Sequence, residues 1–286
     1  MTRLALPLAC VLALAPLASL ASPAVRRPAT RAEIVHQALR SSVRVQVFSA
    51  GQLERSGSGV VVASGPGEGG QVRSEILTNA HVADQTGLQK VTYLVLCERH
   101  GHVVQRLPAR LVAIGRLPDP DLAILQVDEA LPPVTLALER AVEVGDEVVV
   151  VGAPYGKSLS VSGGMLSQIV SADTAPGQPL RFQSMKTDAA IGYGSSGGGV
   201  FVLPGGQLVG LVEGYRTARV DIDAHTGFDV PMPGETFLAP LTEVRGFLAD
   251  HLGRTVFPQA SGLEASSARP PAVPVPAAAM PVAGVH

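Results

Sequence analysis

The sequence of 286 residues contains no tryptophan, and aromatic residues make up only 4% of it. It also lacks an excess of charge of either sign, because 22 basic residues stand against 24 acidic ones. Proteins that bind nucleic acid usually carry a basic surplus, so we expect no nucleic-acid partner. Hydrophobic residues nevertheless account for 46% of the chain, which is enough to bury a substantial core and excludes a disordered protein.

The N-terminal segment, residues 1–24, has the layout of a secretory signal peptide. Arg3 gives it a weakly basic start, an apolar stretch runs on to Leu20, and small residues follow at Ala21 and Ala24. Prolines interrupt the stretch, which is short for a membrane helix of about 20 apolar residues. We therefore expect cleavage near Ala21 or Ala24 and no stable membrane insertion afterwards. A retained membrane anchor is the alternative.

Cysteine is scarce. Once the signal peptide is removed, Cys97 is the only cysteine, which excludes an intramolecular disulfide. His100 and His102 lie close to Cys97 in the sequence and could be taken for metal ligands. No fourth ligand lies nearby, however, and His-Gly-His is typical of the tip of a β-hairpin. We predict no metal site and no cofactor.

Short β runs separated by turn residues dominate the chain between about residues 41 and 240. Six runs fall within residues 41–130 and about six more within 143–240, on either side of a proline-marked linker that begins at Leu131. Two groups of six short strands favour two closed barrels over one open sheet. The sequence therefore predicts an all-β fold of two six-stranded antiparallel β-barrels. The runs are VRVQVF, VVVA, ILT, VTYLVLC, LVAI and LAILQV, then EVVVVG, LSVSGGMLSQIV, LRFQSM, GVFVL, QLVGLVEGY and ETFLAP.

Short helices are predicted at both ends of the strand region, where apolar residues recur at helical spacing. These residues are Ile34, Val35, Ala38 and Leu39 before the first strand, and Leu241, Val244, Phe247 and Leu248 after the last one. Residues 258–286 are mostly Pro, Ala, Ser and Val with few charges. Such a composition is too biased to pack, so it predicts a disordered tail.

Three separate segments each hold one residue type that acyl transfer by a serine requires. His81 lies in LTNAHVAD after a strand, Asp121 lies in DPDLAIL directly before one, and Ser196 lies in the small-residue run GYGSSGGGV. The separations are 121 − 81 = 40 and 196 − 121 = 75 residues. A serine hydroxyl becomes nucleophilic when an imidazole takes its proton, and a carboxylate orients that imidazole. The backbone N–H groups of Gly194 and Ser196 could stabilise the oxyanion.

These segments, in this order, resemble the HtrA/Do branch of the trypsin-like serine proteases. The resemblance runs from about Ile34 to Leu252, and we assign residues 31–252 to a trypsin-like serine protease domain. The matching blocks are SGSGVVV, ILTNAHV, DLAIL, VSGGMLSQIV, MKTDAAIGYGSSGGGVF and GQLVGL. The resemblance implies the chymotrypsin fold and a serine endopeptidase that hydrolyses peptide bonds in exported proteins. It also implies polypeptide substrates, the bacterial periplasm as the location, and a homo-oligomer as one option.

Two of the catalytic assignments have competitors in the sequence. Asp121 is preferred over Asp119 and Asp188 because it abuts the apolar LAIL strand, as in the family motif, whereas Asp119 is typical of a turn before proline. Asp188 is expected to make structural hydrogen bonds. Ser195 is the other candidate nucleophile, but the family pattern has the nucleophile directly before Gly-Gly, which is Ser196.

The substrate pocket is expected to be small and apolar. By resemblance, the residue six before the nucleophile forms the pocket floor, and 196 − 6 gives Ala190. Ile191 and Leu211 are assigned to the pocket with it, and no carboxylate is there to bind Arg or Lys. We therefore expect cleavage after Val, Ala, Ile or similar residues, with loose discrimination.

Several features depart from the family or from its digestive relatives. Ser195 replaces the aspartate that pairs with a new N-terminus in those relatives, so zymogen activation is not expected. Only 286 − 252 = 34 residues follow Leu252, too few for a PDZ domain. Glu213 stands where the family has a small polar residue, so either the alignment slips there or an extra carboxylate perturbs His81. Residues 216–234 match the family poorly and are interpreted as a substrate-side loop.

Two other functions stay open at the sequence level. One is a protease-fold chaperone or binding protein that holds misfolded exported chains without cutting them. The other is a processing protease dedicated to one target.

Overall fold

The computed structural model describes residues 29–67, 70–116, 120–172, 182–222 and 226–253. The expected signal peptide (1–24) and the expected disordered tail (258–286) lie outside these residues. Of the helices in the described ranges, none is both long and apolar enough to cross a membrane.

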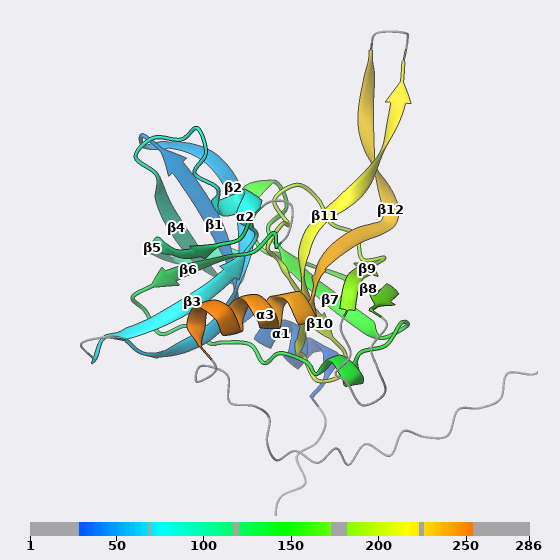
Figure 1. Cartoon of the computed structure of the whole chain (residues 1–286), viewed down its shortest axis with the longest axis horizontal. Coiled ribbons are helices and arrows are strands. Elements are labelled where there is room, and N and C mark those ends of the chain that lie inside the picture. Colours follow the sequence, from blue (N-terminus) through cyan, green and yellow to red (C-terminus); the bar gives the residue numbers. More distant parts are fainter. Residues whose placement is uncertain (1–28, 68–69, 117–119, 173–181, 223–225, 254–286) are drawn as a thin grey trace, which may run out of the picture.

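The strands form two closed antiparallel barrels that lie side by side (Figure 1). The first barrel contains β1 (Ser42–Ser49), β2 (Gln52–Pro66), β3 (Val72–Thr78), β4 (Thr92–Arg99), β5 (His102–Ile114) and β6 (Ala123–Val127). The second contains β7 (Glu147–Gly152), β8 (Ser160–Ser171), β9 (Phe182–Thr187), β10 (Gly199–Val202), β11 (Leu208–Asp221) and β12 (Gly227–Pro240). The strand orders are β1-β2-β3-β6-β5-β4 and β10-β11-β12-β9-β8-β7. The predicted all-β fold of two six-stranded barrels is confirmed.

The period-2 pattern of the strands explains which side chains fill each barrel. In β1, Val43, Val45 and Val47 are buried, while Arg44 and Gln46 between them are half-buried. Strands near the contact between the barrels are instead buried on both faces, because successive side chains point to opposite sides. The valine run of β7 is such a case. Val148 and Val150 pack inside the second barrel, whereas Val149 and Val151 join the core between the barrels.

The two terminal helices cover that shared core (Figure 1). Helix α1 (Arg31–Arg40) begins with a capping box in which Thr30 and Glu33 satisfy each other's backbone N–H groups. Helix α3 (Leu241–Leu252) buries Leu241, Val244, Phe247 and Leu248, the four residues that predicted it. The shared core also holds Phe201, which is fully buried and contributes about 1.5–3 kcal/mol by that burial. This core keeps the facing loops of the two barrels in register.

Two turns differ in how well the sequence anticipated them. The predicted hairpin tip at His100 is confirmed, since His100 (φ 51°) and Gly101 (φ 76°) form the left-handed turn between β4 and β5. Within residues 216–234, interpreted as a loop, residues 216–221 instead continue β11 and residues 227–234 instead belong to β12. These strand ends lie outside the barrel, so burial in the barrel does not mark them.

Candidate active site

The pairing of β3 with β6 brings His81 close to Asp121. Thr78, the last residue of β3, pairs with Ala123, the first residue of β6. The chain leaves β3 through Asn79 into the one-turn helix α2 (Ala80–Ala83), which carries His81. Asp121 precedes β6 by two positions, so both residues emerge at the same edge of the first barrel.

A short hydrogen bond joins the two side chains. His81 Nδ1 donates to Asp121 Oδ2 over 2.6 Å, and the backbone N–H of His81 donates to Asp121 Oδ1 over 2.9 Å. The Asn79 side chain donates to the backbone carbonyl of Asp121 over 2.8 Å, which holds the aspartate segment against α2. The Asp121 side chain is only 12% exposed, whereas that of His81 is 40% exposed. The carboxylate therefore orients a ring that stays partly open to solvent.

The loop between β9 and β10 carries Ser196 and lies directly against the first barrel. The N–H of Ser58 in β2 donates to the Ser196 carbonyl over 2.8 Å. At Gly197 (φ 80°), an added Cβ would lie 2.2 Å from the Ser58 carbonyl oxygen and 2.5 Å from Thr78 Oγ1. Only glycine tolerates that approach. The glycine run thus lets the serine loop of one barrel close onto β2 and the end of β3 of the other.

The hydroxyl of Ser196 donates to the backbone carbonyl of Glu213 over 3.2 Å. Among the described residues, no hydrogen bond joins it to the His81 ring. Such catalytic hydrogen bonds are often long or absent without substrate and form in the complex. Glu213 thus contacts the Ser196 hydroxyl through its backbone carbonyl. The carbonyl of the preceding residue, Val212, accepts a hydrogen bond from the Gly197 N–H over 2.9 Å.

The competing residues occupy different positions. Ser195 is only 3% exposed, and its hydroxyl accepts a weak hydrogen bond of 3.4 Å from the Gly192 N–H, so it faces the interior of the loop. Asp188 accepts from the Met165 N–H over 2.7 Å, in keeping with the structural role expected for it. Asp119 lies outside the described residues.

Ser58 is a site residue that the sequence analysis quoted within SGSGVVV but did not single out. Its hydroxyl donates to the Gly194 carbonyl over 2.8 Å and accepts from the Ala153 N–H over 2.9 Å. Gly194 has φ 88°, and an added Cβ would lie 2.7 Å from the Ala153 carbonyl oxygen. Ser58 thus fixes the peptide that follows Gly194 from the side of the first barrel. The N–H groups of Gly194 and Ser196 donate to no other described residue.

Replacing Ser58 with alanine should lower kcat about tenfold with little change in KM, because one hydrogen bond that orients this peptide is worth about 1.4 kcal/mol. Steady-state kinetics on a chromogenic peptide measures both constants. Ser56→Ala is the matched control, since the Ser56 hydroxyl lies two residues away in β2 and is buried with no hydrogen-bond partner among the described residues. Equal activity of both variants would remove Ser58 from the positioning role.

The three residues expected to bind substrate do not lie together in the structure. Ala190 is exposed and Ile191 half-buried, and both line a cavity of about 250 Å³ together with Val150, Gly152, Pro154, Tyr155, Ser160, Ser162, Gly192 and Ser195. No carboxylate lines this cavity. Leu211 requires a correction. Its side chain is fully buried in the core between the barrels, so it cannot contact a substrate.

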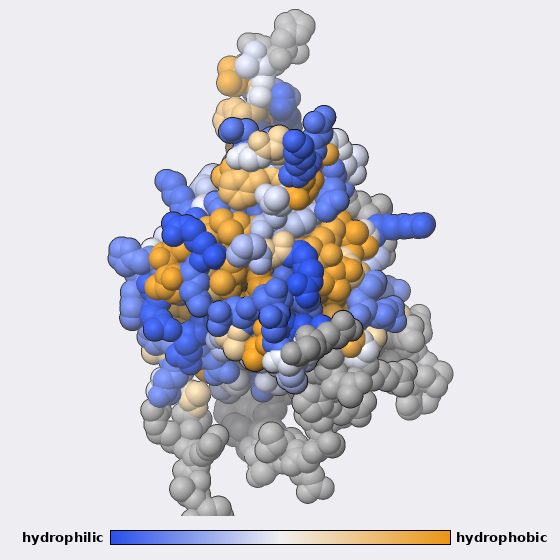
Figure 2. Space-filling model, turned by 90° about the vertical axis from the view of Figure 1, so that its left-hand side faces the viewer, coloured by the Kyte–Doolittle hydropathy of each residue, from blue (hydrophilic) through white to orange (hydrophobic). Residues whose placement is uncertain are grey.

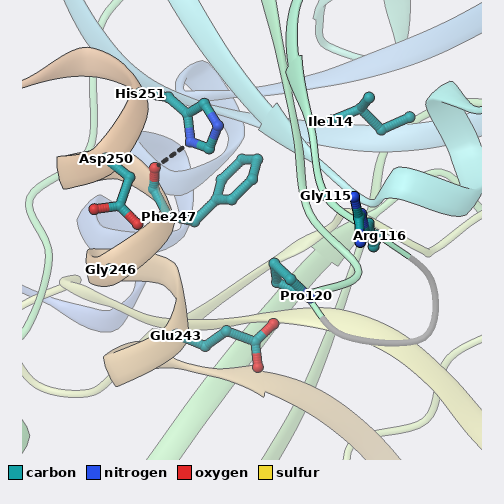
Figure 3. Close-up of a pocket in the computed structure, with 9 residues that line it drawn as sticks. All are labelled: Ile114, Gly115, Arg116, Pro120, Glu243, Gly246, Phe247, Asp250 and His251. Atoms are coloured by element: carbon teal, nitrogen blue, oxygen red, sulfur yellow. Dashed lines mark hydrogen bonds between the residues drawn. The ribbon is translucent and has the colours of Figure 1, made fainter.

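A second cavity of about 430 Å³ lies between the end of β5 and α3 (Figure 3). Figure 3 shows the rings of Phe247 and His251 side by side on α3, with His251 Nδ1 donating to the Phe247 carbonyl over 2.8 Å. Pro120 on the opposite wall directly precedes Asp121. His81 and Ser196 do not line this cavity.

Cys97, His100 and His102 form no metal site in the part of the chain that the structure describes. Burial raises the pKa of the Cys97 thiol to about 11, with a smaller contribution from Glu129. At neutral pH the thiol is therefore protonated, which makes it a poor nucleophile and a poor metal ligand.

The profile of the trypsin-like peptidase domain family matches residues 57–211. A putative serine protease HhoB from Synechocystis sp. is 29% identical over 180 residues, which cover 62% of this chain and 38% of the relative. Periplasmic serine endoprotease DegP from Salmonella typhimurium is 31% identical over 157 residues, which cover 54% of this chain and 29% of the relative. Serine endoprotease DegS from Haemophilus influenzae is 32% identical over 162 residues, which cover 56% and 42%.

The fold is similar to that of a solved HtrA-type protease with a tripeptide. The TM-score is 0.56 at 24% sequence identity, with 79% of this chain and 64% of that chain covered. At this identity the likeness concerns the fold alone. The chain spans between 29% and 42% of the length of the three curated relatives named above.

Proposed function

Because the chain belongs to the trypsin-like peptidase domain family and its relatives are HtrA-type serine proteases, we propose that it is a serine endopeptidase with His81, Asp121 and Ser196 as its catalytic triad. The observation that carries this proposal is the 2.6 Å hydrogen bond from His81 Nδ1 to Asp121 Oδ2. That hydrogen bond leaves Nε2 as the acceptor in the neutral ring, which is the tautomer a general base needs.

The reaction begins when a polypeptide binds with its scissile peptide bond beside Ser196. Ser196 exchanges its hydrogen bond to the Glu213 carbonyl for one to His81 Nε2. His81 then takes the hydroxyl proton as Ser196 Oγ attacks the scissile carbonyl carbon, and it later gives the proton to the leaving amine. Asp121 stabilises the imidazolium that forms between the two transfers. Water then attacks the acyl carbonyl carbon while His81 takes its proton. His81 gives that proton to Ser196 Oγ as the acyl product leaves.

The N–H groups of Gly194 and Ser196 stabilise the oxyanion of each tetrahedral intermediate. Losing one such donor typically costs about 2.7–4 kcal/mol of transition-state stabilisation. Ser58 supports this arrangement because it binds the Gly194 carbonyl and thereby sets the orientation of the neighbouring peptide. The left-handed conformation of Gly194 is part of the same arrangement.

Cleavage should follow small aliphatic residues. Ala190 and Ile191 are apolar, and no carboxylate lines the cavity that they border. One methylene changes binding by only about 1–3 kcal/mol, so Val, Ala and Ile at the cleaved position should differ by roughly 10–200-fold at most. Profiling cleavage sites in a peptide library by mass spectrometry measures this preference. Dominant cleavage after Arg or Lys would contradict the assigned pocket.

The proposed location is the periplasm, because residues 1–24 have a signal-peptide pattern and a relative is named a periplasmic serine endoprotease. Labelling of the purified protein by a fluorophosphonate tests the enzyme proposal, because the probe reacts with an activated serine. Hydrolysis of casein separates a broad endopeptidase from one dedicated to a single target. A protein that is neither labelled nor active on any peptide would fit the chaperone alternative instead.

A further inference from the structure

Two oppositely charged side chains of the first barrel are buried as a pair. Hydrophilic residues are spread over the face of this barrel that Figure 2 shows, as is usual for charged groups that water solvates. The side chains of Arg44 in β1 and Glu98 in β4 are instead only 12% and 3% exposed. Arg44 pairs with Leu96 in the strand register, so Glu98, two residues further on, projects from the same face. Arg44 Nε lies 2.7 Å from Glu98 Oε1, which makes a buried ion pair.

Both members of the ion pair also bind the second barrel, at the segment that joins β7 to β8. We call residues 153–159 the β7–β8 turn. Arg44 Nη1 donates to the Gly156 carbonyl over 2.6 Å. Glu98 Oε2 accepts from the Leu159 N–H over 2.9 Å. Two strands of the first barrel thus hold the β7–β8 turn at two points of its backbone.

The β7–β8 turn packs against the loop that carries Ser196. The N–H of Tyr155 donates to the carbonyl of Tyr193, the residue before Gly194. An added Cβ at Gly194 would lie 3.0 Å from the Gly156 nitrogen and 3.2 Å from the Tyr155 nitrogen, so the two backbones are in direct contact. A displaced turn would therefore displace Gly194, whose N–H is one of the two proposed oxyanion donors.

The conformation of the β7–β8 turn needs support from outside it. Tyr155 has φ 57° and ψ 24°, in the left-handed region that is unfavourable for a residue with a Cβ. Tyr155 is also 72% exposed, so burial of its ring does not hold that conformation. Strained backbone persists where the surrounding contacts fix it. The hydrogen bonds from Arg44 and to Glu98 are contacts of this kind, because they hold the backbone on the C-terminal side of Tyr155.

We infer that Arg44 and Glu98 are positioning residues for catalysis: the ion pair holds the β7–β8 turn, and the turn holds the oxyanion donor Gly194 in place. This inference rests on the proposed function, because it assigns the pair to the oxyanion donors of that site. Apolar residues of similar volume often replace a buried ion pair at no cost in stability, so stability alone is a weak reason for the pair. Its partners give a specific reason. A carbonyl needs a donor and an N–H needs an acceptor, and the pair supplies one of each.

A double substitution separates positioning from stability. Arg44→Met combined with Glu98→Met removes both charges together, so no unpaired charge stays buried and the thermal melt should change little. The hydrogen bonds to the Gly156 carbonyl and from the Leu159 N–H are lost, however. We expect kcat on a chromogenic peptide to fall by about ten- to a hundredfold, with a smaller change in KM, because displaced oxyanion donors act mainly on the transition state.

Arg245→Met combined with Glu139→Met is the matched control. Arg245 Nε lies 3.0 Å from Glu139 Oε1, and the same guanidinium donates to the backbone carbonyl of Ala137. This pair therefore has the same chemistry, but it links α3 to residues 137–139 rather than to the β7–β8 turn. The control should keep the wild-type kcat. An equal loss of kcat in both double variants would contradict a positioning role for Arg44 and Glu98.

A charge-reversed pair tests the direction of the hydrogen bonds. Arg44→Glu combined with Glu98→Arg keeps opposite charges on β1 and β4. It places a carboxylate at the Gly156 carbonyl and a guanidinium at the Leu159 N–H, and neither contact is a hydrogen bond. We therefore expect kcat to stay as low as in the apolar double variant. Recovery of the wild-type kcat would show that the ion pair acts only as a structural link, and it would overturn the inference.

Hydrogen–deuterium exchange gives a readout that does not depend on activity. In the apolar double variant, peptides that cover residues 153–160 and 190–197 should exchange faster than in the wild type, whereas peptides from β3 and β6 should not. Unchanged exchange in the first two segments overturns the inference. So does an equal acceleration in all four, because that is the result of a general loss of stability.

Fluorophosphonate labelling in the same samples keeps this test separate from the proposed enzyme function. A wild type that takes no label counts against the protease proposal, while faster exchange in residues 190–197 of the apolar double variant still supports the hold of the ion pair on that loop. A fully labelled wild type together with unchanged kcat in the apolar double variant has the opposite meaning: the protease proposal stands and the positioning role of Arg44 and Glu98 is wrong.

Discussion

Replacing Ser196 with alanine is expected to abolish fluorophosphonate labelling and to lower kcat on a peptide substrate by about 10⁶-fold. The reason is that the proposed nucleophile is removed, while binding and the oxyanion donors remain and retain only a small residual rate over water. The measurement combines gel detection of the labelled band with kinetics at high enzyme concentration.

Ser195→Ala is the matched control for this experiment. Ser195 is the adjacent residue of the same type, but its side chain is buried and its hydroxyl accepts a hydrogen bond from the Gly192 N–H. We expect Ser195→Ala to keep the label and most of the activity. Loss of labelling in Ser195→Ala with retention in Ser196→Ala would reverse the assignment of the nucleophile.

Replacing Asp121 with asparagine is expected to lower kcat by about 10⁴-fold at neutral pH. Asparagine has nearly the same shape, but its amide group presents an N–H to His81 Nδ1 where the carboxylate accepts one over 2.6 Å. The ring then adopts the wrong tautomer, and the imidazolium loses its counter-charge. Steady-state kinetics measures the loss, and circular dichroism verifies that the variant folds.

Asp128→Asn provides the comparison for Asp121. Asp128 lies at the end of the same strand region, and its side chain is 59% exposed in a surface ion pair with Arg110. Exposed pairs of this kind contribute about 0–1 kcal/mol, so Asp128→Asn should be nearly silent in both stability and activity. If Asp121→Asn retained activity within a few fold of the wild type, Asp121 would not be the orienting carboxylate.

The strands of the barrels were largely predictable from sequence, because each has a local signal. Alternation marks β1, where Val43, Val45 and Val47 face the interior. A continuous valine run marks β7, which is buried on both faces. The outer parts of β11 and β12, residues 216–221 and 227–233, were not predictable in the same way. These residues face solvent on both sides, so neither burial in the barrel nor the family pattern distinguishes them from a loop.

The residues of the candidate site also differ in how well the sequence predicted them. His81, Asp121 and Ser196 stood out because their residue types lie in ordered motifs, and Gly194 because a tight loop needs glycine. Leu211 was misassigned, since its apolar side chain looks the same in a sequence whether it faces a substrate or a core. Ser58 was overlooked because its hydrogen bond to Gly194 spans 136 residues of sequence.

The sequence by itself determined the secondary-structure elements. Apolar periodicity depends only on nearby residues and specifies the strands and helices, and the His-Gly-His motif specifies the turn at His100. Only the tertiary structure decided which elements meet, because closing each barrel sets the register of β3 with β6 and so the distance between His81 and Asp121. It also decided that the serine loop lies against β2 and that Leu211 is buried.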